Sequence, residues 1–485
     1  MTIRKPVFNF IGGEWRPPET GTYLEDADPA TGQTITQIPR SGADDVANAV
    51  KAARSAFETW SNVSMVERAE LLEAVAGRIE ARMKELAKLE SIDTGKPYDL
   101  AMRLDIPRAV SNFRFFAQAI RQTSTGFHEM PGAINYTLRQ PIGIAGLITP
   151  WNLPLYLLSW KMAPALAMGN TIVAKPSELT PLTADALAQI FEELKAPPGI
   201  FNLIHGYGHE AGQALVEHPE IGLISFTGGT VTGKKVATTA APMFKKLSLE
   251  LGGKNPTLVF ADRFTPETVK GVARSAFLNQ GQICLCGSRI LVERSIHDRF
   301  TEELAREIKT WKIGPPQNEG VQFGALISHD HLAKIERYVQ MARELGGRIV
   351  TGGQRAKLPA PYDRGAFYEP TIITGLSSGC EPATEEIFGP VITVHPFDNE
   401  AQAVTMANEV RYGLSASVWT SDLDRAHRVS RKIEAGTVWV NTWLMRDLRV
   451  PFGGMKDSGV GREGGEHSLE FFSESKNVCI QLGAF

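Results

Sequence analysis

The sequence predicts an α/β protein with two parallel-sheet domains. Its 485 residues exceed the size at which a single hydrophobic core stops growing, so more than one domain is expected. Short apolar segments alternate with amphipathic stretches, which is typical of parallel strands covered by helices on both faces. This alternation runs in two series, and the seam between them is expected near Gly252 and Gly253.

The first series begins with helices. Apolar residues recur every three or four positions from Asp44 to about Gly95, and a further helix is expected up to Arg121. Strands and helices then alternate. The expected strands are 143–149, 170–174, 201–204, 223–226 and 247–251, and the expected helices are 155–168, 184–194, 210–217 and one after Gly233.

The second series follows Asn255, and its expected strands are 257–260, 289–292, 391–395, 417–420 and 437–440. Two further segments fit neither series. Residues 133–138 alternate weakly, and residues 477–482 form a late strand with no helix after it. We expect these two segments to pair with each other and across subunits.

Composition excludes several classes of protein. The formal net charge is -3, which gives no electrostatic reason to expect a nucleic-acid or membrane partner. No stretch approaches the ~20 apolar residues of a membrane span, and no apolar run follows the charges of the N-terminus. The four cysteines are too few for a disulfide framework, so we expect free thiols and a cytoplasmic location.

Cys284 is the candidate nucleophile. It stands in a glycine-flanked turn between an expected helix and the strand that starts at Arg289. A cysteine at a turn can reach a substrate, and its thiolate is a strong nucleophile. Equally, a cysteine in an apolar neighbourhood can be a small core residue.

Two polar residues follow other strands. Glu250 ends an apolar strand at the seam, where partial burial would raise its pKa toward the range of a general base. Asn152 follows a strand at its carboxyl end, where its amide N–H could hold an oxyanion. The alternatives are a solvated glutamate and a turn-forming asparagine.

The first series also offers a dinucleotide site. Lys175 and Glu178 follow a strand and could bind ribose hydroxyls, while residues 226–233 form a strand, a glycine turn and a helix start that could face a phosphate. No strand is followed by G-x-G-x-x-G, because Gly206, Gly208 and Gly212 have the wrong spacing.

Taken together, these segments resemble the aldehyde dehydrogenase superfamily over essentially the whole chain. The matching motifs stand in the family's order. They are Thr149-Pro-Trp-Asn152, Lys175-Pro-Ser-Glu178, Gly228 to Gly233 as G-x-T-x-x-G, Leu249-Glu-Leu-Gly-Gly-Lys254, Gln280-Gly-Gln-Ile-Cys284 with Ser288-Arg289, Glu385-Glu-Ile-Phe-Gly-Pro390 and Pro451-Phe-Gly-Gly-Met-Lys456.

The resemblance implies two Rossmann-type domains and a bridging oligomerisation β-flap. Residues 1–121 and 142–251 would form the NAD-binding domain, and residues 252–450 the catalytic domain. Residues 122–141 and 466–485 would form the oligomerisation segments of a homodimer or homotetramer.

The resemblance also implies site roles. Cys284 would be the nucleophile, Asn152 and the Cys284 backbone N–H the oxyanion hole, and Glu250 the base that activates the deacylating water. The cofactor would be NAD, since the carboxylate of Glu178 would repel a 2′-phosphate. No metal is expected. The implied cofactor-binding residues are Thr149, Pro150, Trp151, Lys175, Ser177, Glu178, Gly208, Gly212, Phe226, Thr227, Gly228, Thr230, Gly233, Leu251, Glu386 and Phe388.

Three segments, 151–158, 283–286 and 441–448, look most similar to 2-aminomuconate and 2-hydroxymuconate semialdehyde dehydrogenases. Their substrates carry a carboxylate remote from the aldehyde, which requires a cation in the tunnel, preferably an arginine. Arg103 and Arg446 match that pattern. The expected substrate-binding residues are Arg103, Arg446, Asn152, Tyr156 and Leu158.

Other functions stay open at this point. The same fold could oxidise an uncharged aliphatic, betaine-type or retinal-type aldehyde, in which case both arginines would lie outside the tunnel. Coenzyme A could replace water, although retention of Glu250 argues against this. A crystallin-like structural protein is disfavoured by the intact Cys284, Glu250 and Asn152. A cysteine hydrolase would need a histidine, and none stands in the matched motifs.

Overall fold

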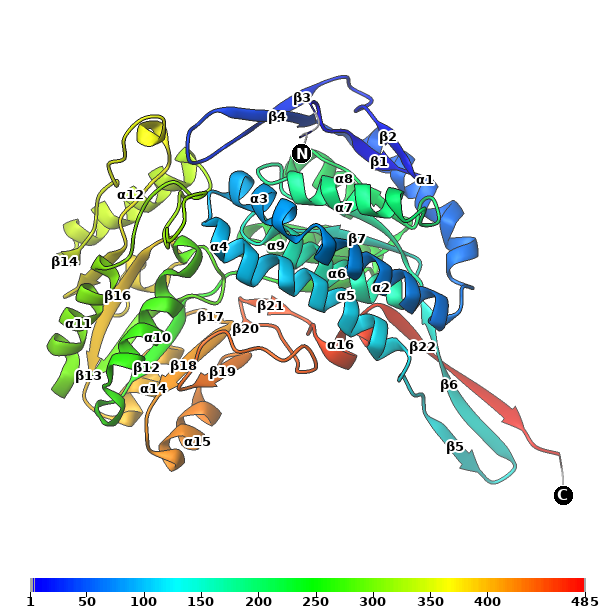
Figure 1. The fold of residues 1–485 in the computed structure, drawn as a ribbon. Helices are drawn as coiled ribbons and strands as arrows, with labels where there is room; N and C mark the ends of the chain where they lie inside the picture. The colour runs from blue at the N-terminus through cyan, green and yellow to red at the C-terminus, as the bar shows by residue number, and fades with distance from the viewer. Residues whose placement is uncertain (1–2, 4, 484–485) are drawn as a thin grey trace.

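A computed structural model describes residues 3 and 5–483, and two large sheets dominate it (Figure 1). The first has the order β2-β1-β9-β8-β7-β10-β11-β21. Its five central strands are parallel, and antiparallel strands close both edges. The strands are β1 (Asn9–Ile11), β2 (Glu14–Arg16), β7 (Ile144–Ile148), β8 (Thr171–Lys175), β9 (Phe201–Leu203), β10 (Ile221–Thr227), β11 (Lys246–Glu250) and β21 (Gly459–Val460).

Helices cover both faces of this sheet, and strand alternation explains why. In β7, Ala145 and Leu147 point into one core cluster, whereas Ile144 points into the other. The first cluster holds α2 (Met65–Ala81), α3 (Met83–Thr94), α5 (Ile106–Ile120), α6 (Pro154–Ala167) and α7 (Leu182–Glu193). The second holds α1 (Ala43–Trp60), α8 (Gln213–Glu217) and α9 (Thr230–Ala240).

The second sheet has the order β14-β15-β16-β13-β12-β18-β19 and is parallel except for β14. Its strands are β12 (Asn255–Val259), β13 (Gly287–Glu293), β14 (Arg348–Thr351), β15 (Thr371–Thr374), β16 (Val391–Phe397), β18 (Ser415–Trp419) and β19 (Thr437–Val440). Its helices are α10 (Pro266–Phe277), α11 (His297–Lys309), α12 (His329–Glu344), α14 (Glu400–Asn408) and α15 (Leu423–Lys432).

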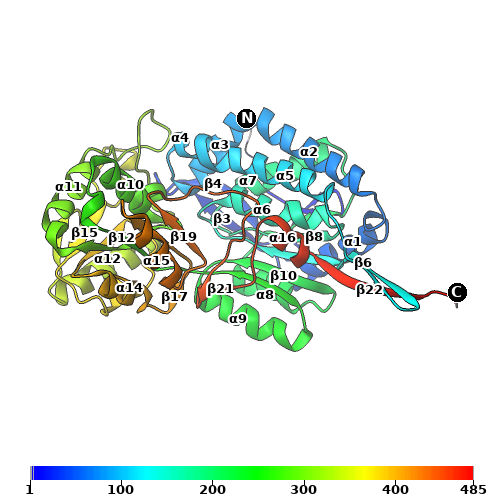
Figure 2. The same cartoon turned by 90° about the horizontal axis from the view of Figure 1, so that it is seen from below.

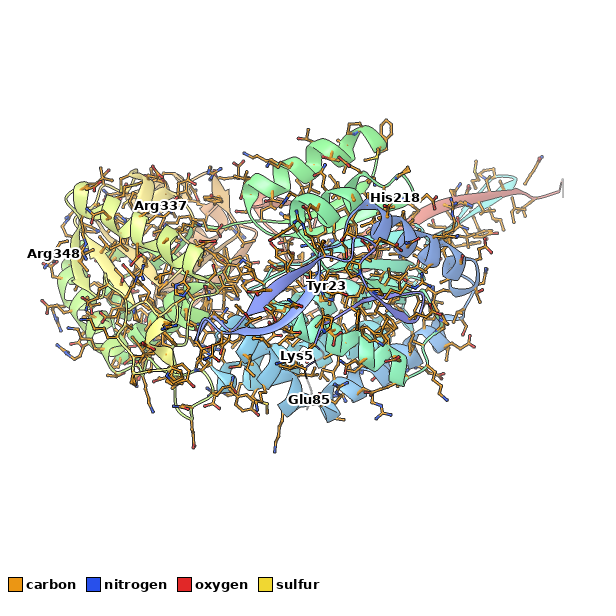
Figure 3. All side chains as sticks on the ribbon, turned by 90° about the horizontal axis from the view of Figure 1, so that it is seen from above. Lys5, Tyr23, Glu85, His218, Arg337 and Arg348 are labelled. Atoms are coloured by element: carbon orange, nitrogen blue, oxygen red, sulfur yellow. The ribbon has the colours of Figure 1, made fainter. Side chains whose placement is uncertain are left out.

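The two sheets form two lobes that lie side by side (Figure 2). Seen from above, Arg337 on α12 and Arg348 on β14 belong to one lobe, and Tyr23 and His218 belong to the other (Figure 3). Glu250 belongs to the first lobe, at the end of β11, and Cys284 to the second, between α10 and β13. The fold thus confirms the prediction of an α/β protein with two parallel sheets.

A three-stranded antiparallel flap projects away from both lobes (Figures 1 and 3). It consists of β5 (Phe127–Met130), β6 (Ala133–Pro141) and β22 (Ser473–Gln481). β22 pairs with β6 along its whole length, from Ser473 opposite Pro141 to Gln481 opposite Ala133. The predicted pairing of the two leftover segments within one chain is therefore confirmed.

Some elements differ from the sequence-based prediction. The N-terminal strands β1, β2, β3 (Tyr23–Ala27) and β4 (Thr34–Pro39) were not predicted. Helix α9 begins at Thr230, three residues before Gly233. Residues 466–471, expected in the oligomerisation segment, lie in α16 (Gly465–Phe471), which packs against α5 and α6. Across residues 3 and 5–483, no helix has the length and hydropathy to span a membrane.

Candidate active site

Cys284 lies in a loop whose backbone is tightly constrained. The loop joins α10 to β13, and Asn279, Gln280 and Gly281 have φ angles of 54°, 56° and 70°. An added Cβ at Gly281 would lie 2.2 Å from the carbonyl oxygen of Gly389, so only glycine fits there. The Cys284 carbonyl accepts a 2.6 Å hydrogen bond from Asn255 Nδ2. These contacts hold the thiol in one place.

The two neighbouring thiols point in different directions. Cys284 lines two adjoining cavities, whereas Cys286 lines neither and its thiol donates toward the Leu278 carbonyl at 3.9 Å. Burial raises the pKa of Cys286 to about 12. Burial, and then the charges of Glu386 and Glu250, raise the pKa of Cys284 well above its usual value. The resting Cys284 is therefore a thiol that must lose its proton before it attacks.

Glu250 ends β11 beside this thiol. Its side chain is buried, it lines both cavities, and neither carboxylate oxygen has a hydrogen-bond partner. Burial, and then the charge of Glu463, raise its pKa well above the usual value for a glutamate. Gly453 gives the carboxylate room, since a Cβ there would lie 2.9 Å from Oε1. A desolvated, unpartnered carboxylate of this kind is suited to accept a proton near neutral pH.

Asn152 follows β7 and is also buried. Its Nδ2 donates a 2.9 Å hydrogen bond to the carbonyl oxygen of Gln282, two residues before the nucleophile. An amide nitrogen carries two hydrogens, so one remains for another acceptor. Asn152 and Cys284 both line the larger cavity.

The larger cavity has a volume of about 400 Å³ and lies where β7, β8, β10 and β11 end. Ligands bind at the carboxyl ends of strands in open α/β sheets. Most of the expected cofactor-binding residues line this cavity. They are Thr149, Pro150, Trp151, Lys175, Ser177, Glu178, Phe226, Thr227, Gly228, Leu251, Glu386 and Phe388.

Four of the expected cofactor-binding residues do not line the cavity. Gly233 instead packs α9 closely, since a Cβ there would lie 2.4 Å from Leu251 Cδ2. The Thr230 hydroxyl donates to the Asp457 carbonyl at 3.5 Å. Gly208 and Gly212 bound a short π-helix behind Lys175.

Charged side chains line the larger cavity in two places. Lys175 Nζ lies 3.2 Å from Glu178 Oε2. Elsewhere in the lining, the Gly253 N–H donates to Glu386 Oε1 at 2.9 Å, and a Cβ on Gly252 would lie 2.2 Å from Glu386 Oε2. A glycine at position 252 is therefore needed for Glu386 to hold this position.

Among the residues of this cavity that sequence reasoning missed are His331 and Lys334, both on α12. The His331 ring lies 5.3 Å from the Trp151 ring, and its Nε2 lies 2.7 Å from the Phe388 carbonyl oxygen. Phe388 has a φ of 60°, and this contact helps to hold that conformation. No sequence motif predicted that α12 lines the cavity, because its side chains reach the cavity only through tertiary packing.

A second, narrower cavity adjoins the first. It shares Leu157, Thr227, Glu250 and Cys284 with the larger cavity, so the thiol and the carboxylate stand at the junction. The rest of its wall is mostly apolar. These residues are Leu104, Leu153, Tyr156, Trp160, Ile283, Leu285, Leu444, Arg446, Phe452 and Glu463.

Arg446 is the cation of this narrower cavity. Its Nη1 donates a 3.1 Å hydrogen bond to the Tyr156 hydroxyl, and its guanidinium lies 3.8 Å from the Phe452 ring centroid. Within residues 3 and 5–483, no carboxylate forms an ion pair with it. Arg446 therefore has aromatic neighbours and no ion-pair partner in that part of the chain, and the Glu250 carboxylate acts on it only at longer distance.

Comparison with known proteins identifies the family. The model of the aldehyde dehydrogenase family matches residues 15–478. The chain belongs to the aldehyde dehydrogenase family. It is 48% identical to the 2-aminomuconic semialdehyde dehydrogenase of Danio rerio, over 98% of each chain. It is 46% identical to the 2-hydroxymuconic semialdehyde dehydrogenase of Pseudomonas sp. strain CF600, over 99% of this chain and 100% of that one.

Solved structures show the same fold. An NAD⁺ complex of an aldehyde dehydrogenase from Bacillus cereus has a TM-score of 0.96 and 37% identity, with 99% of this chain and 98% of that chain covered. The expected family and the expected aldehyde-dehydrogenase-like α/β fold are both confirmed.

Three expected substrate-binding residues of this aldehyde dehydrogenase lie outside the narrow cavity, and one of them, Asn152, lines the larger cavity instead. Leu158 points into the core, and its neighbour Leu157 lines both cavities. Arg103 is exposed, and its Nε donates to the Asp99 carbonyl at 3.1 Å. It stands in a π-helix (Ala101–Asp105), whose wider turn alters which residues face inward. Here Leu104 lines the cavity.

Another arginine stands closer to the site of this aldehyde dehydrogenase. Arg108 on α5 is partly buried, and its guanidinium lies 5.4 Å from the Tyr156 ring centroid. Asn112, one turn later, donates to the Tyr156 carbonyl at 3.1 Å, so this face of α5 packs on α6. The spacing of Arg108 and Asn112 was the only signal in the sequence, and it does not distinguish a binding arginine from a surface one.

Proposed function

We propose that this aldehyde dehydrogenase oxidises a carboxylate-bearing semialdehyde of the 2-aminomuconate or 2-hydroxymuconate type to the acid, with NAD and through a thioester on Cys284. Two relatives, 48% and 46% identical, carry these names. The single observation that carries the proposal is a pair of arginines, Arg446 and Arg108, on the same tyrosine beside the cavity that ends at Cys284.

The charge of this pair favours an anion. Burial lowers the pKa of Arg108, and the nearby charge of Arg446 lowers it further. Among residues 3 and 5–483, neither guanidinium has an ion-pair partner. A substrate carboxylate near Tyr156 would relieve this repulsion, and guanidinium donors suit the geometry of a carboxylate. An uncharged aldehyde would leave both guanidinium groups without an ion-pair partner, and Arg446 would have only the longer-range charge of Glu250 to balance it.

The larger cavity fits NAD. Gly228 and Gly229 line it directly before α9. The Gly228 N–H donates to the Glu250 carbonyl oxygen at 3.0 Å, so the N–H groups of the first turn of α9 are the donors available to a phosphate. Lys175 and Glu178 would hold the adenosine ribose, and Glu386 the nicotinamide ribose. The carboxylate of Glu178 disfavours a 2′-phosphate. When bound, NAD accepts the hydride that leaves the substrate carbon.

The residues of this chain then account for the remaining chemistry. The Cys284 thiol first gives its proton to solvent in the cavity, and the resulting thiolate attacks the aldehyde carbon. The free N–H of the Asn152 amide and the Cys284 backbone N–H hold the developing oxyanion. After oxidation the carbon is a thioester. Glu250 takes a proton from water, which attacks the thioester and releases the acid and the Cys284 thiolate.

We also propose the domain roles and an oligomer. Residues 1–121 and 142–251 would bind NAD, since Thr149, Lys175 and Phe226 follow or end strands of the first sheet; residues 252–450 would carry the nucleophile. The flap exposes large apolar side chains, which suits burial in a homodimer or homotetramer. They are Phe127, Met130, Leu138 and Ile480.

The test is the rate of NADH formation with 2-hydroxymuconate semialdehyde and with an uncharged aldehyde of similar length. Arg446→Ala should lower kcat/KM for the charged substrate by roughly 10²-fold, as expected for a buried charge pair, and leave the uncharged aldehyde almost unaffected. Arg449→Ala is the matched control, because Arg449 is exposed and paired with Asp447. Equal turnover of both substrates by wild type and by Arg446→Ala would exclude the muconate-type substrate.

A further inference from the structure

We infer that Lys96 is a positioning residue for the oxyanion hole, which it serves by fixing the peptide group of Asn152. This inference rests on the proposed role of the Asn152 amide. Lys96 is fully buried and follows the C-cap glycine of α3. Its Nζ donates a 2.9 Å hydrogen bond to the carbonyl oxygen of Asn152. It also donates to Asp105 Oδ1 at 3.0 Å, which supplies the counter-charge.

Asn152 is held on both sides of its Cα. Its carbonyl oxygen accepts from Lys96 and also from Asn279 Nδ2, at 3.2 Å. Its side-chain Nδ2 donates to the Gln282 carbonyl, which Asn279 Nδ2 also approaches at 3.3 Å. The oxyanion amide and the nucleophile loop thus share one hydrogen-bonded cluster. Within this cluster Lys96 is the only charged donor to Asn152 among residues 3 and 5–483.

The Lys96 segment is itself tied to the nucleophile loop. The Ala325 N–H donates to the Gly95 carbonyl at 2.9 Å, and the Ala325 carbonyl accepts from Gln280 Nε2 at 2.8 Å. Gly95 has a φ of 75°, and a Cβ there would lie 2.9 Å from the Ala325 oxygen. These hydrogen bonds through Ala325 fix the position of the turn relative to the Cys284 loop. Lys96 extends from this turn, and its ammonium group reaches the Asn152 carbonyl oxygen.

Burying an ammonium group costs more free energy than a single hydrogen bond to a carbonyl oxygen returns. Desolvating it carries a large penalty, which the pairing with Asp105 only partly offsets. Glu90 Oε1 lies 3.9 Å away, and burial raises the Glu90 pKa to about 7. A charge-assisted hydrogen bond is stronger and shorter than a neutral one, so it restricts the Asn152 peptide more tightly. Oxyanion donors act through preorganisation, so such a restriction has a catalytic use.

The test is a double-mutant cycle on the first turnover. The rate of the NADH burst is measured in wild type, Lys96→Met, Asn152→Ala and the double variant, with the Kd for NAD measured alongside. We expect Lys96→Met to slow the burst by roughly 10²-fold, the loss typical of a misplaced catalytic group, and to leave the Kd unchanged. In the Asn152→Ala background, the same substitution should change the burst by less than about twofold, because its effect passes through Asn152.

Two further variants keep the inference falsifiable. Lys96→Met with Asp105→Asn removes the buried ammonium together with the carboxylate that is hydrogen-bonded to it, so it is the variant for the same measurement if Lys96→Met alone is unstable. Lys245→Met is the matched control. Lys245 also donates a hydrogen bond to a backbone carbonyl, that of His218 at 2.5 Å, but it lies in another part of the chain. Its burst should equal that of wild type.

The outcomes separate the two claims. A Lys96→Met burst at the wild-type rate, or a loss of equal size in both backgrounds, would overturn the role of Lys96 and leave that of Asn152 intact. If Asn152→Ala itself burst at the wild-type rate, the proposed oxyanion hole would fail, and the role of Lys96 would fail with it. A large loss in the wild-type background alone supports both.

Discussion

Arg446 and Tyr156 form a 3.1 Å hydrogen bond between residues that are 290 positions apart in the sequence. The bond joins the loop after β19 in one lobe to α6 in the other. It points the guanidinium along the wall of the narrow cavity, at whose inner end Cys284 and Glu250 stand. The separation between these arginines, Arg446 and Arg108, and the Cys284 thiol therefore sets the length of a substrate whose carboxylate binds the arginines while its aldehyde reaches the thiol.

Arg108→Ala should raise KM for 2-hydroxymuconate semialdehyde by about tenfold, which is the effect of losing roughly 1.4 kcal/mol of binding. The reason is that the Arg108 guanidinium faces the same tyrosine as Arg446. Arg103→Ala is the matched control on the same stretch of chain, because its guanidinium donates to the Asp99 carbonyl at the surface. Steady-state kinetics of both variants decide the matter. A larger effect at Arg103 than at Arg108 would contradict this assignment.

Cys284→Ala should abolish NADH formation while the Kd for NAD stays within about twofold, because no other thiol lines the cavities formed by the described residues. Cys286→Ala should keep most of the activity, since its thiol points to the Leu278 carbonyl. Mass spectrometry after a thiol-reactive probe should then find the label on Cys284 in wild type. Loss of turnover in Cys286→Ala with Cys284 intact would show that the neighbour has a chemical role.

The sequence was sufficient where local patterns decide structure. Apolar runs such as 143–149 predicted the central strands, and the motif around Glu250 and Cys284 predicted which polar groups meet. It was insufficient where tertiary geometry decides. The π-helix at Ala101–Asp105 changes which residues of that helical segment face inward, so Leu104 lines the cavity and Arg103 does not. His331 enters through the packing of α12, for which no local pattern exists.

Gly252→Ala should weaken NAD binding by at least tenfold. The added Cβ would lie 2.2 Å from Glu386 Oε2, so the carboxylate must move from the position in which Gly253 N–H holds it. Gly77→Ala, in the middle of α2 with open space around it, is the control and should bind NAD normally. Titration of protein fluorescence with NAD gives both constants. An unchanged Kd in Gly252→Ala would mean that Glu386 does not contact the nicotinamide ribose.

The pH dependence of turnover should report Glu250. Burial and Glu463 raise its pKa, so the base form is lost as the pH falls through a value above the usual range of a glutamate. Steady-state kcat should therefore decrease on the acid side with an apparent pKa higher than about 4.3, while the NADH burst, which precedes water attack, persists.

Glu250→Gln isolates this step. The variant should release about one NADH per active site. Its steady-state rate should then be at least 10²-fold below that of wild type, which is the contribution typical of a general base. The thioester on Cys284 should be detectable by mass spectrometry of the denatured protein. Its residual rate should no longer follow the acid limb of the wild-type profile. Multiple rapid turnovers in Glu250→Gln, with the acid limb unchanged, would assign water activation to another group, and Glu463, which faces the same cavity, would be the next residue to replace.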